Sequence, residues 1–341
     1  MNNFTKNIFL EDWPQADLEL IPACPVCHSQ HASMKHHSVR DWSFGTAPGI
    51  WKYWSCNECQ SLYLNPRPTP ESIGKAYANY YTHKPALLND GFQGLKLRWK
   101  NERLSLRLGC SISPRFNLQN ALKTWALKKA HRLNLPFGIE ILATLPAGRF
   151  MDVGCGSGNI VSLANQLGWQ SSGIEIDPIA VKSAQRAGLN VTEGSYQQLI
   201  LHQQSFDLIL CSHVIEHVYD PLDLLTAIHG SLRPGGLLLL STPNAQSDVH
   251  LQFGPYWRGL EAPRHLSIFS EAILTRLMQQ IGFEVSSHSD DSLETVKQSR
   301  KIEKLAAKND LLDKKINKQS INQIHRTKGG HDFIKLSARK I

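Results

Sequence analysis

The stretch Phe150–Ile160, FMDVGCGSGNI, decides the fold of this 341-residue chain. It opens with an apolar run, as expected for a short buried strand, and Asp152 lies near the end of that strand. Three glycines at alternate positions then lead into a predicted helix: Gly154, Gly156 and Gly158. Glycine is needed where the backbone takes a positive φ or must touch a ligand. Because the first N–H groups of a helix lack partners within it, the stretch predicts a strand–turn–helix unit that binds a polar ligand.

Two classes of ligand use such a glycine turn, namely dinucleotides and S-adenosylmethionine. A dinucleotide site has the pattern G-x-G-x-x-G, which would place its third glycine at the position of Asn159. The observed G-x-G-x-G spacing, with an acid just before it, favours a methionine-type ligand whose ammonium group lies close to Asp152. We therefore predict S-adenosylmethionine as the cofactor, with contacts from Asp152, Gly154, Cys155 and Gly156.

Further apolar runs follow at the spacing of alternating strands and helices. The second strand, about residues 170–176, carries Glu175, whose carboxylate is predicted to accept both ribose hydroxyls. The third begins at Phe206, and the fourth lies within LRPGGLLLLSTPN, residues 232–244. Apolar runs separated by helical patterns indicate βαβ units and a parallel sheet buried on both faces. The predicted fold class is α/β, with a doubly wound, mostly parallel sheet.

Four motifs occur in the order found in class I S-adenosylmethionine-dependent methyltransferases: DVGCGSGN, GIEID, HVIEHV and LRPGG. Residues 148–288 resemble that family. The resemblance implies a seven-stranded, Rossmann-like sheet and cofactor contacts from Ile176 and Ser212. It also implies one from Ser195, which stands where many relatives have an acid for the adenine amino group.

Four of the seven cysteines form two C-x-x-C pairs separated by 28 residues. Four thiolates around one tetrahedral ion make a closed, structural zinc site, which stabilises a domain too small to fold on its core alone. A β-hairpin over residues 38–54 would fill the gap between the pairs. We predict structural Zn²⁺ bound by Cys24, Cys27, Cys56 and Cys59.

The zinc ribbon is followed by an Asn-Pro-Arg-Pro turn and a tyrosine-containing helix expected to start at Pro70. This arrangement resembles the N-terminal part of zinc-ribbon methyltransferases of bacterial saccharide and cell-surface biosynthesis. We expect a zinc-ribbon domain with its helix at 1–84, a basic helical connector at 85–146 and the methyltransferase domain at 147–341. A basic helical insertion at about 291–328 precedes a run expected to form a final edge strand.

The formal net charge of +8 is unevenly distributed. Counting Lys and Arg against Asp and Glu, residues 1–84 are neutral, 85–146 carry +7, 147–290 carry −6 and 291–341 carry +7. The basic segments can face nucleic acid, an anionic membrane surface or a phosphorylated acceptor, or they can be solvated helix faces. The first residues lack the basic-then-apolar order of a signal peptide, so we expect a cytoplasmic protein.

Methyl transfer to oxygen needs the acceptor held in line with the methyl group and its proton removed. His213 directly follows the third predicted strand, which makes it the first candidate for the general base. The ubiquinone-pathway and small-RNA methyltransferases have a similar E-x-x-E-H metal motif; this chain keeps Glu216 and His217 but has His213 in place of the first Glu. Because magnesium prefers oxygen ligands, the substitution disfavours a magnesium site and suits zinc or iron better. The alternative is a metal-free site in which His217 packs against the cofactor.

A second cluster lies in the loop at residues 254–270, after the fourth strand, where ligands of open parallel sheets bind. We predict that His265 is a second candidate base and that the acceptor is contacted by Tyr256, Trp257 and Arg264. The alternative is a loop that only covers the core.

The function we expect is O-methylation of a saccharide or a phosphate-linked sugar intermediate. Three alternatives stay open: a zinc-ribbon RNA methyltransferase, a metal-dependent O-methyltransferase of a phenolic small molecule, and a non-catalytic module that binds the cofactor. The expected partners are a small-molecule or saccharide acceptor, with nucleic acid and a peripheral anionic membrane contact as further candidates.

Overall fold

The computed structural model describes residues 11–77, 92–114, 116, 135, 137–288, 294–308 and 332–341. The chain divides into two compact units. Unit 1 comprises Met1–Tyr80, His213–Thr226 and Leu240–Ala338; unit 2 comprises Tyr81–Ser212, Ala227–Leu239 and Arg339–Ile341. The three-part division expected from the sequence stays a prediction. No helix among these described residues is long and apolar enough to cross a membrane.

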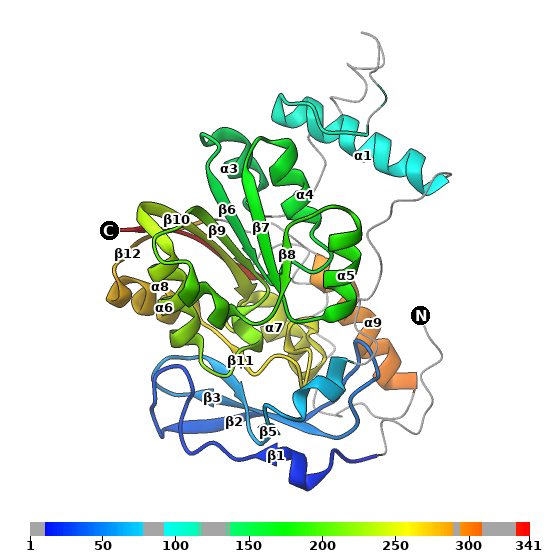
Figure 1. Cartoon of the computed structure of the whole chain (residues 1–341). Coiled ribbons are helices and arrows are strands. Elements are labelled where there is room, and N and C mark those ends of the chain that lie inside the picture. Colours follow the sequence, from blue (N-terminus) through cyan, green and yellow to red (C-terminus); the bar gives the residue numbers. More distant parts are fainter. Residues whose placement is uncertain are drawn as a thin grey trace. The chain divides into compact units, whose positions relative to one another are not determined.

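The largest sheet has seven strands in the order β12-β13-β10-β9-β6-β7-β8. Where β6 pairs with β7 and β9, and β7 with β8, the strands are parallel, as the apolar runs predict (Figure 1). The seven-stranded, mostly parallel α/β fold is therefore confirmed. Its strands are β6 (Arg149–Val153), β7 (Gln170–Glu175), β8 (Val191–Glu193), β9 (Phe206–Ser212), β10 (Leu232–Pro243), β12 (Phe283–Ser287) and β13 (Phe333–Lys340).

The prediction of a final edge strand was wrong, because β13 lies between β12 and β10 and β12 occupies the edge. Alternate residues of β13 are fully buried, namely Ile334, Leu336 and Ala338. An interior strand has neighbours on both sides, and its apolar face packs in the core. Alternation alone did not distinguish this position from an edge.

Unit 2 packs helices against β6, β7 and β8. Its core includes Phe150 of β6, Leu208 of β9 and Trp169, whose indole N–H donates to the carbonyl of Leu142 at 2.9 Å. The first connector helix ends at Leu108, before a glycine with a φ of 68°, and the second expected one, near 118–134, lies outside the described residues. The other helical elements are α1 (Phe92–Leu108), α3 (Ile139–Thr144), α4 (Asn159–Gln166), α5 (Pro178–Arg186), η5 (Tyr196–Leu201) and α6 (Pro221–Ser231), whose first residues belong to unit 1.

Unit 1 is built around a four-stranded sheet in the order β11-β4-β3-β2. The expected hairpin is present as β2 (Ala32–Val39) and β3 (Trp51–Cys56), which pair antiparallel. Strand β11 (Ser267–Ile268) comes from the loop after β10 and pairs antiparallel with β4 (Leu62–Leu64). The N-terminal ribbon and the segment around residue 265 therefore share one sheet and one core.

The remaining elements of unit 1 surround that sheet. The helix expected to start at Pro70 begins within the described residues at Ile73, as the 3-10 helix η3 (Ile73–Tyr77), and the residues that follow lie outside the described part. The insertion does contain a helix, α9 (Glu294–Lys308), whose Ile302 and Ala306 pack against Trp42 and Tyr256. The others are η2 (Gln15–Asp17), β1 (Leu18–Glu19), β5 (Arg67–Pro68), η6 (Ile215–His217), α7 (Asp248–Phe253), η7 (Gly254–Tyr256), η8 (Arg258–Leu260) and α8 (Glu271–Ile281).

Candidate functional site

The glycine turn of unit 2 adopts the backbone shape that its sequence predicts. The φ angles of Gly154, Gly156 and Gly158 are 73°, 54° and 78°, a region that residues with a Cβ rarely adopt. The N–H of Gly156 donates to a carboxylate oxygen of Glu175 at 2.7 Å. The turn and the acid that ends β7 are therefore joined directly at the carboxyl ends of β6 and β7.

Glu175 is buried and both of its carboxylate oxygens accept backbone hydrogen bonds. One accepts from Gly156, and the other accepts the N–H of Asp177 at 2.9 Å. A carboxylate can accept about four hydrogen bonds, so acceptor capacity is left for ribose hydroxyls. That role of Glu175 stays a prediction.

Asp152 lies beside this turn and is buried. Burial, with a smaller contribution from the charge of Glu175, raises the pKa of Asp152 to about 8. A cationic group next to Asp152 would favour its ionised form. A methionine ammonium meets that requirement, which makes the site's electrostatics consistent with the predicted ligand.

The other residues at or beside the predicted cofactor site differ in how much of their side chains is exposed. Gly173 has no room for a side chain, because a Cβ would lie 2.5 Å from the sulfur of Cys155. Burial raises the pKa of the Cys155 thiol, which keeps it protonated. Ile176 is 73% exposed, so an apolar face is available beside Glu175. Ser195 and Ser212 are half-buried, and their cofactor contacts stay predictions.

In unit 1, His213 follows directly on β9 and has a φ of 57°, an uncommon value for a residue with a side chain. Its Nδ1 lies 3.3 Å from Oε1 of the fully buried Glu216, whose Oε2 accepts from the hydroxyl of Thr242 at 2.8 Å. Burial would raise the pKa of Glu216, but the His213 hydrogen bond and the neighbouring histidines lower it to about 2. For His213, burial acts to lower the pKa, yet Glu216 outweighs it and the pKa is raised. The pair is therefore a histidine oriented by an anionic carboxylate.

Glu216 also belongs to a second group, with His217 and His265, whose ligand atoms lie within 4.8 Å of one another. Nδ1 of His217 lies 3.0 Å from the carbonyl oxygen of Arg264, and Nδ1 of His265 lies 2.7 Å from that of Gly259. Because a carbonyl only accepts, each Nδ1 acts as the donor in its contact, which leaves Nε2 as the ring atom that could bind a metal ion. Metal-binding histidines are commonly oriented in this way, so the three side chains fit a divalent ion.

Arg264 was predicted to contact the acceptor, and in the structure its guanidinium has partners within unit 1. The side chain is fully buried, and both carboxylate oxygens of Asp41 accept from it. Its Nη1 also donates to the carbonyl of Ala76 at 2.8 Å, and its Nε lies 3.4 Å from Glu261. These partners all come from unit 1. A phosphate contact of Arg264 stays an untested prediction.

Tyr256 and Trp257 are both about 98% buried, at 2% exposure each. The indole N–H of Trp257 donates to Asp332 at 3.2 Å, and its ring stacks against His250 with 4.9 Å between centroids. Tyr256 packs near Trp42. The structure therefore brings His213, Glu216 and His265 into one unit, while the two aromatic side chains lie in its core.

The two C-x-x-C pairs meet as predicted. Sγ of Cys24 lies 3.7 Å from that of Cys59, and Sγ of Cys27 lies 3.5 Å from that of Cys56. Four sulfurs at about 2.3 Å from a tetrahedral zinc ion would lie about 3.8 Å apart. The residue after each pair, His28 and Gln60, has a φ near 60°, so the two turns have the same shape. The cluster fits one tetrahedral metal ion.

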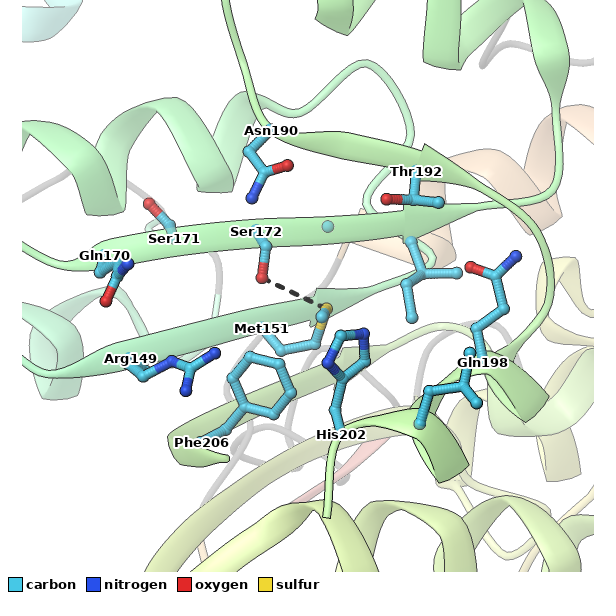
Figure 2. Close-up of a pocket in the computed structure, with 13 residues that line it drawn as sticks. Arg149, Met151, Gln170, Ser171, Ser172, Asn190, Thr192, Gln198, His202 and Phe206 are labelled. Carbon is cyan, nitrogen blue, oxygen red and sulfur yellow. Dashed lines mark hydrogen bonds between the residues drawn. The ribbon is translucent and has the colours of Figure 1, made fainter. Parts of the chain in front are cut away.

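Unit 2 also has a groove of about 390 Å³ on one face of β6, β7 and β8. Figure 2 shows Phe206 and His202 on one side of it and Asn190 on the other. Arg149 and Gln170, which begin β6 and β7, line it as well. Ligands of open parallel sheets bind beyond the carboxyl ends of the strands. The groove reaches the opposite ends, so we do not identify it with the cofactor site.

Sequence reasoning missed two acids and a tyrosine that lie next to the predicted site residues. Glu261, Asp41 and Tyr77 were not predicted as site residues, although each contacts Arg264 or His217. Asp41 is 223 residues from Arg264 and Tyr77 is 140 residues from His217, so no local pattern links these pairs. Buried acids near the predicted base were the available signal.

The chain resembles known methyltransferases in sequence. Residues 126–288 match the family model described as a methyltransferase domain. A protein named ubiquinone biosynthesis O-methyltransferase from Xanthomonas campestris is 37% identical over 127 residues, which cover 34% of this chain and 53% of the relative. One of the same name from Dinoroseobacter shibae is 30% identical over 148 residues, covering 40% and 60%. The chain thus spans about half the length of the curated relatives it matches.

The chain also aligns with solved structures of SAM-dependent methyltransferases. A SAM-dependent methyltransferase from Archaeoglobus fulgidus aligns with a TM-score of 0.43 and 18% identity, covering 57% of this chain and 86% of that one. One from Mesorhizobium loti aligns with a TM-score of 0.41 and 20% identity, covering 60% and 96%. Together with the seven-stranded sheet, the family match confirms the predicted class I methyltransferase domain.

Proposed function

We propose that this chain, whose residues 126–288 form a methyltransferase domain, transfers the methyl group of S-adenosylmethionine to an oxygen atom of a small-molecule acceptor. The observation that carries the proposal is the glycine turn bonded to Glu175 beside the buried Asp152. Backbone N–H groups and two acids at the carboxyl ends of parallel strands suit a ligand with a ribose and an ammonium group. When bound, S-adenosylmethionine supplies an activated methyl group.

The residues of the protein orient the acceptor and remove its proton. Because Glu216 is anionic, it holds the proton of His213 on Nδ1 and leaves Nε2 as the base. His213 is about 44% exposed at its side chain, so an acceptor hydroxyl can reach it. A histidine in this state removes the hydroxyl proton as the oxygen attacks the methyl group.

The acceptor we propose first is a saccharide or a phosphate-linked sugar. This rests on the resemblance of the ribbon and its following turn to saccharide-pathway methyltransferases. In the structure Trp257 is buried and the guanidinium of Arg264 pairs with Asp41, so these two residues add no further support to this choice. The methyl-transfer panels described below test this acceptor class.

A metal-dependent O-methyltransferase of a phenol is the second candidate. The convergence of Glu216, His217 and His265 favours it, as does the name of the curated relatives. These three side chains would hold the ion, which would lower the pKa of an acceptor hydroxyl. Two imidazoles and one carboxylate suit zinc or iron better than magnesium.

We further propose that Cys24, Cys27, Cys56 and Cys59 bind a structural Zn²⁺ ion. The sulfur–sulfur distances and the burial of three of the four thiols support this. With four protein ligands the ion has no open position for water or substrate, so its role is to stabilise the ribbon.

The test is methyl transfer from labelled S-adenosylmethionine to panels of sugar nucleotides, lipid-linked sugars, catechols and RNA. Each panel is run with and without a chelator, and the zinc content of the protein is measured after treatment. We expect transfer to a sugar hydroxyl that persists while the ribbon keeps its zinc. The matched pair of variants is His213→Asn, which should lose transfer, and the exposed His202→Gln, which should not.

The other outcomes identify the alternatives. Transfer to a catechol that needs an added divalent ion supports the metal-dependent enzyme. RNA methylation whose binding falls steeply with salt supports the nucleic-acid enzyme. Tight binding of S-adenosylhomocysteine without transfer to any panel, or to the protein itself, contradicts an enzyme and supports the binding module.

A further inference from the structure

Two tyrosine side chains from the N-terminal part of the chain contact the segments that carry His217 and His265. The hydroxyl of Tyr53 donates toward two carbonyl oxygens, those of Leu260 and His265, at 2.6 and 2.7 Å. The hydroxyl oxygen of Tyr77 lies 3.1 Å from Nδ1 of His217. One tyrosine therefore contacts the backbone of His265 and the other contacts the ring of His217, and all four residues belong to unit 1.

The contact with Tyr77 has a defined direction. Nδ1 of His217 is also 3.0 Å from the carbonyl oxygen of Arg264, which only accepts, so this contact favours the ring proton on Nδ1. The oxygen of Tyr77 is then a second acceptor for the same proton. Together the two oxygens favour the tautomer with a free lone pair on Nε2.

Arg264 connects the segment of Tyr77 with His217, because its side chain and its backbone carbonyl each contact one of them. Its guanidinium donates to the carbonyl of Ala76, the residue before Tyr77, at 2.8 Å, while its own carbonyl accepts from His217. The charge of Arg264 is balanced by Asp41, which also accepts the N–H groups of the loop at residues 44–47. One buried ion pair therefore fixes the position of Tyr77 and the orientation of His217 together.

We infer that Tyr77 and Arg264 are positioning residues for the cluster of Glu216, His217 and His265, and that together they favour the tautomer of His217 whose lone pair is on Nε2. The ribbon is then an integral part of this site and not a separate recognition module. The inference rests on the proposed methyltransferase function for its kinetic consequence, but the tautomer itself can be observed without turnover.

The test compares Tyr77→Phe with Tyr219→Phe. Tyr219 is a matched control, because its hydroxyl donates to the backbone carbonyl of Pro68 at 2.8 Å and not to a histidine. For Tyr77→Phe we expect kcat to fall by about 10- to 100-fold, as for other groups that orient a functional histidine. The affinity for S-adenosylhomocysteine, measured by calorimetry, should not change. Nitrogen NMR of the imidazole rings should show a mixture of His217 tautomers in Tyr77→Phe and one tautomer in the control.

A second variant covers the case in which Tyr77→Phe does not fold. Arg264→Lys keeps the buried charge but loses the planar fork, and it should also mix the tautomers of His217. An unchanged tautomer and an unchanged kcat in both folded variants would overturn the inference. If the wild-type protein transfers no methyl group but shows the single tautomer that the variants lose, the proposed function fails and the positioning role stands.

Discussion

The glycine turn of unit 2 and the histidine cluster of unit 1 are assembled in different ways. The turn is made by backbone groups of one continuous stretch together with Glu175, about 20 residues later. The cluster combines side chains from the ribbon, from the segment after β9 and from the loop before β11. A site built from local backbone is readable in a sequence, whereas a site built from buried charges depends on the tertiary fold. The predictions below test whether the two regions can be impaired separately.

The largest effect should come from the ribbon. Removing zinc with a strong chelator, or replacing Cys56 by Ser, should unfold the four-stranded sheet, because structural zinc contributes about 10–16 kcal/mol to such small domains. Since β11 pairs with β4 in that sheet, the loop carrying His265 should lose its order as well. The measurements are zinc content, near-UV circular dichroism and methyl transfer. Retained transfer in zinc-free protein would contradict the view that the ribbon supports the cluster.

The next effect concerns the proposed base. His213→Asn should lower kcat by about 100- to 10,000-fold, the usual contribution of a general base. Asn tolerates the left-handed backbone found at position 213, so the turn should survive. Calorimetry should show unchanged binding of S-adenosylhomocysteine. If kcat falls less than tenfold, another group removes the proton, and this result would support the metal-dependent O-methyltransferase.

The same contrast explains how much of the molecule was predictable. The strands β6, β7, β9 and β10 and the glycine turn followed from apolar runs and glycine spacing, because parallel strands are buried on both faces. The four zinc-site cysteines followed from their pairing. Arg264 was predicted to contact the acceptor because it lies in a polar, aromatic loop, and only the fold shows that Asp41 lies beside its guanidinium. The position of β13 and the pairing of β11 with the ribbon are also tertiary facts that no local pattern contains.

A smaller effect should be seen on cofactor binding as the pH changes. Because burial raises the pKa of Asp152 to about 8, the free protein carries a neutral carboxyl below that pH. Pairing with a methionine ammonium needs the ionised form, so the affinity for S-adenosylhomocysteine should rise about tenfold per pH unit from pH 6 toward pH 8. Asp152→Asn should bind more weakly at pH 8 and show no such slope. A flat profile in the wild-type protein would remove Asp152 from the ammonium site.

The smallest effect concerns the packing of β2 on α7. His250 donates from Nδ1 to the carbonyl of Ala245 at 2.6 Å, so its Nε2 accepts from Nε2 of His36 at 2.8 Å. Burial and the neighbouring charges lower the pKa of His36 to about 3, and burial lowers that of His250 to about 4. The unfolded chain takes up these protons near pH 6.5, so between about pH 6.5 and pH 4 it binds more protons than the folded protein.

The contribution of the pair is therefore fully present above pH 6.5 and is lost as the pH falls. Each histidine should reduce the free energy of unfolding by up to about 1.4 kcal/mol per pH unit in that window. Urea unfolding followed by tryptophan fluorescence should show a slope reduced by about half in His250→Gln, which accepts the same hydrogen bond without titrating. The exposed His202→Gln should leave the slope unchanged. Equal slopes in all three proteins would mean that acid acts through other groups, and the contact of the ribbon with α7 would then owe its stability to packing alone.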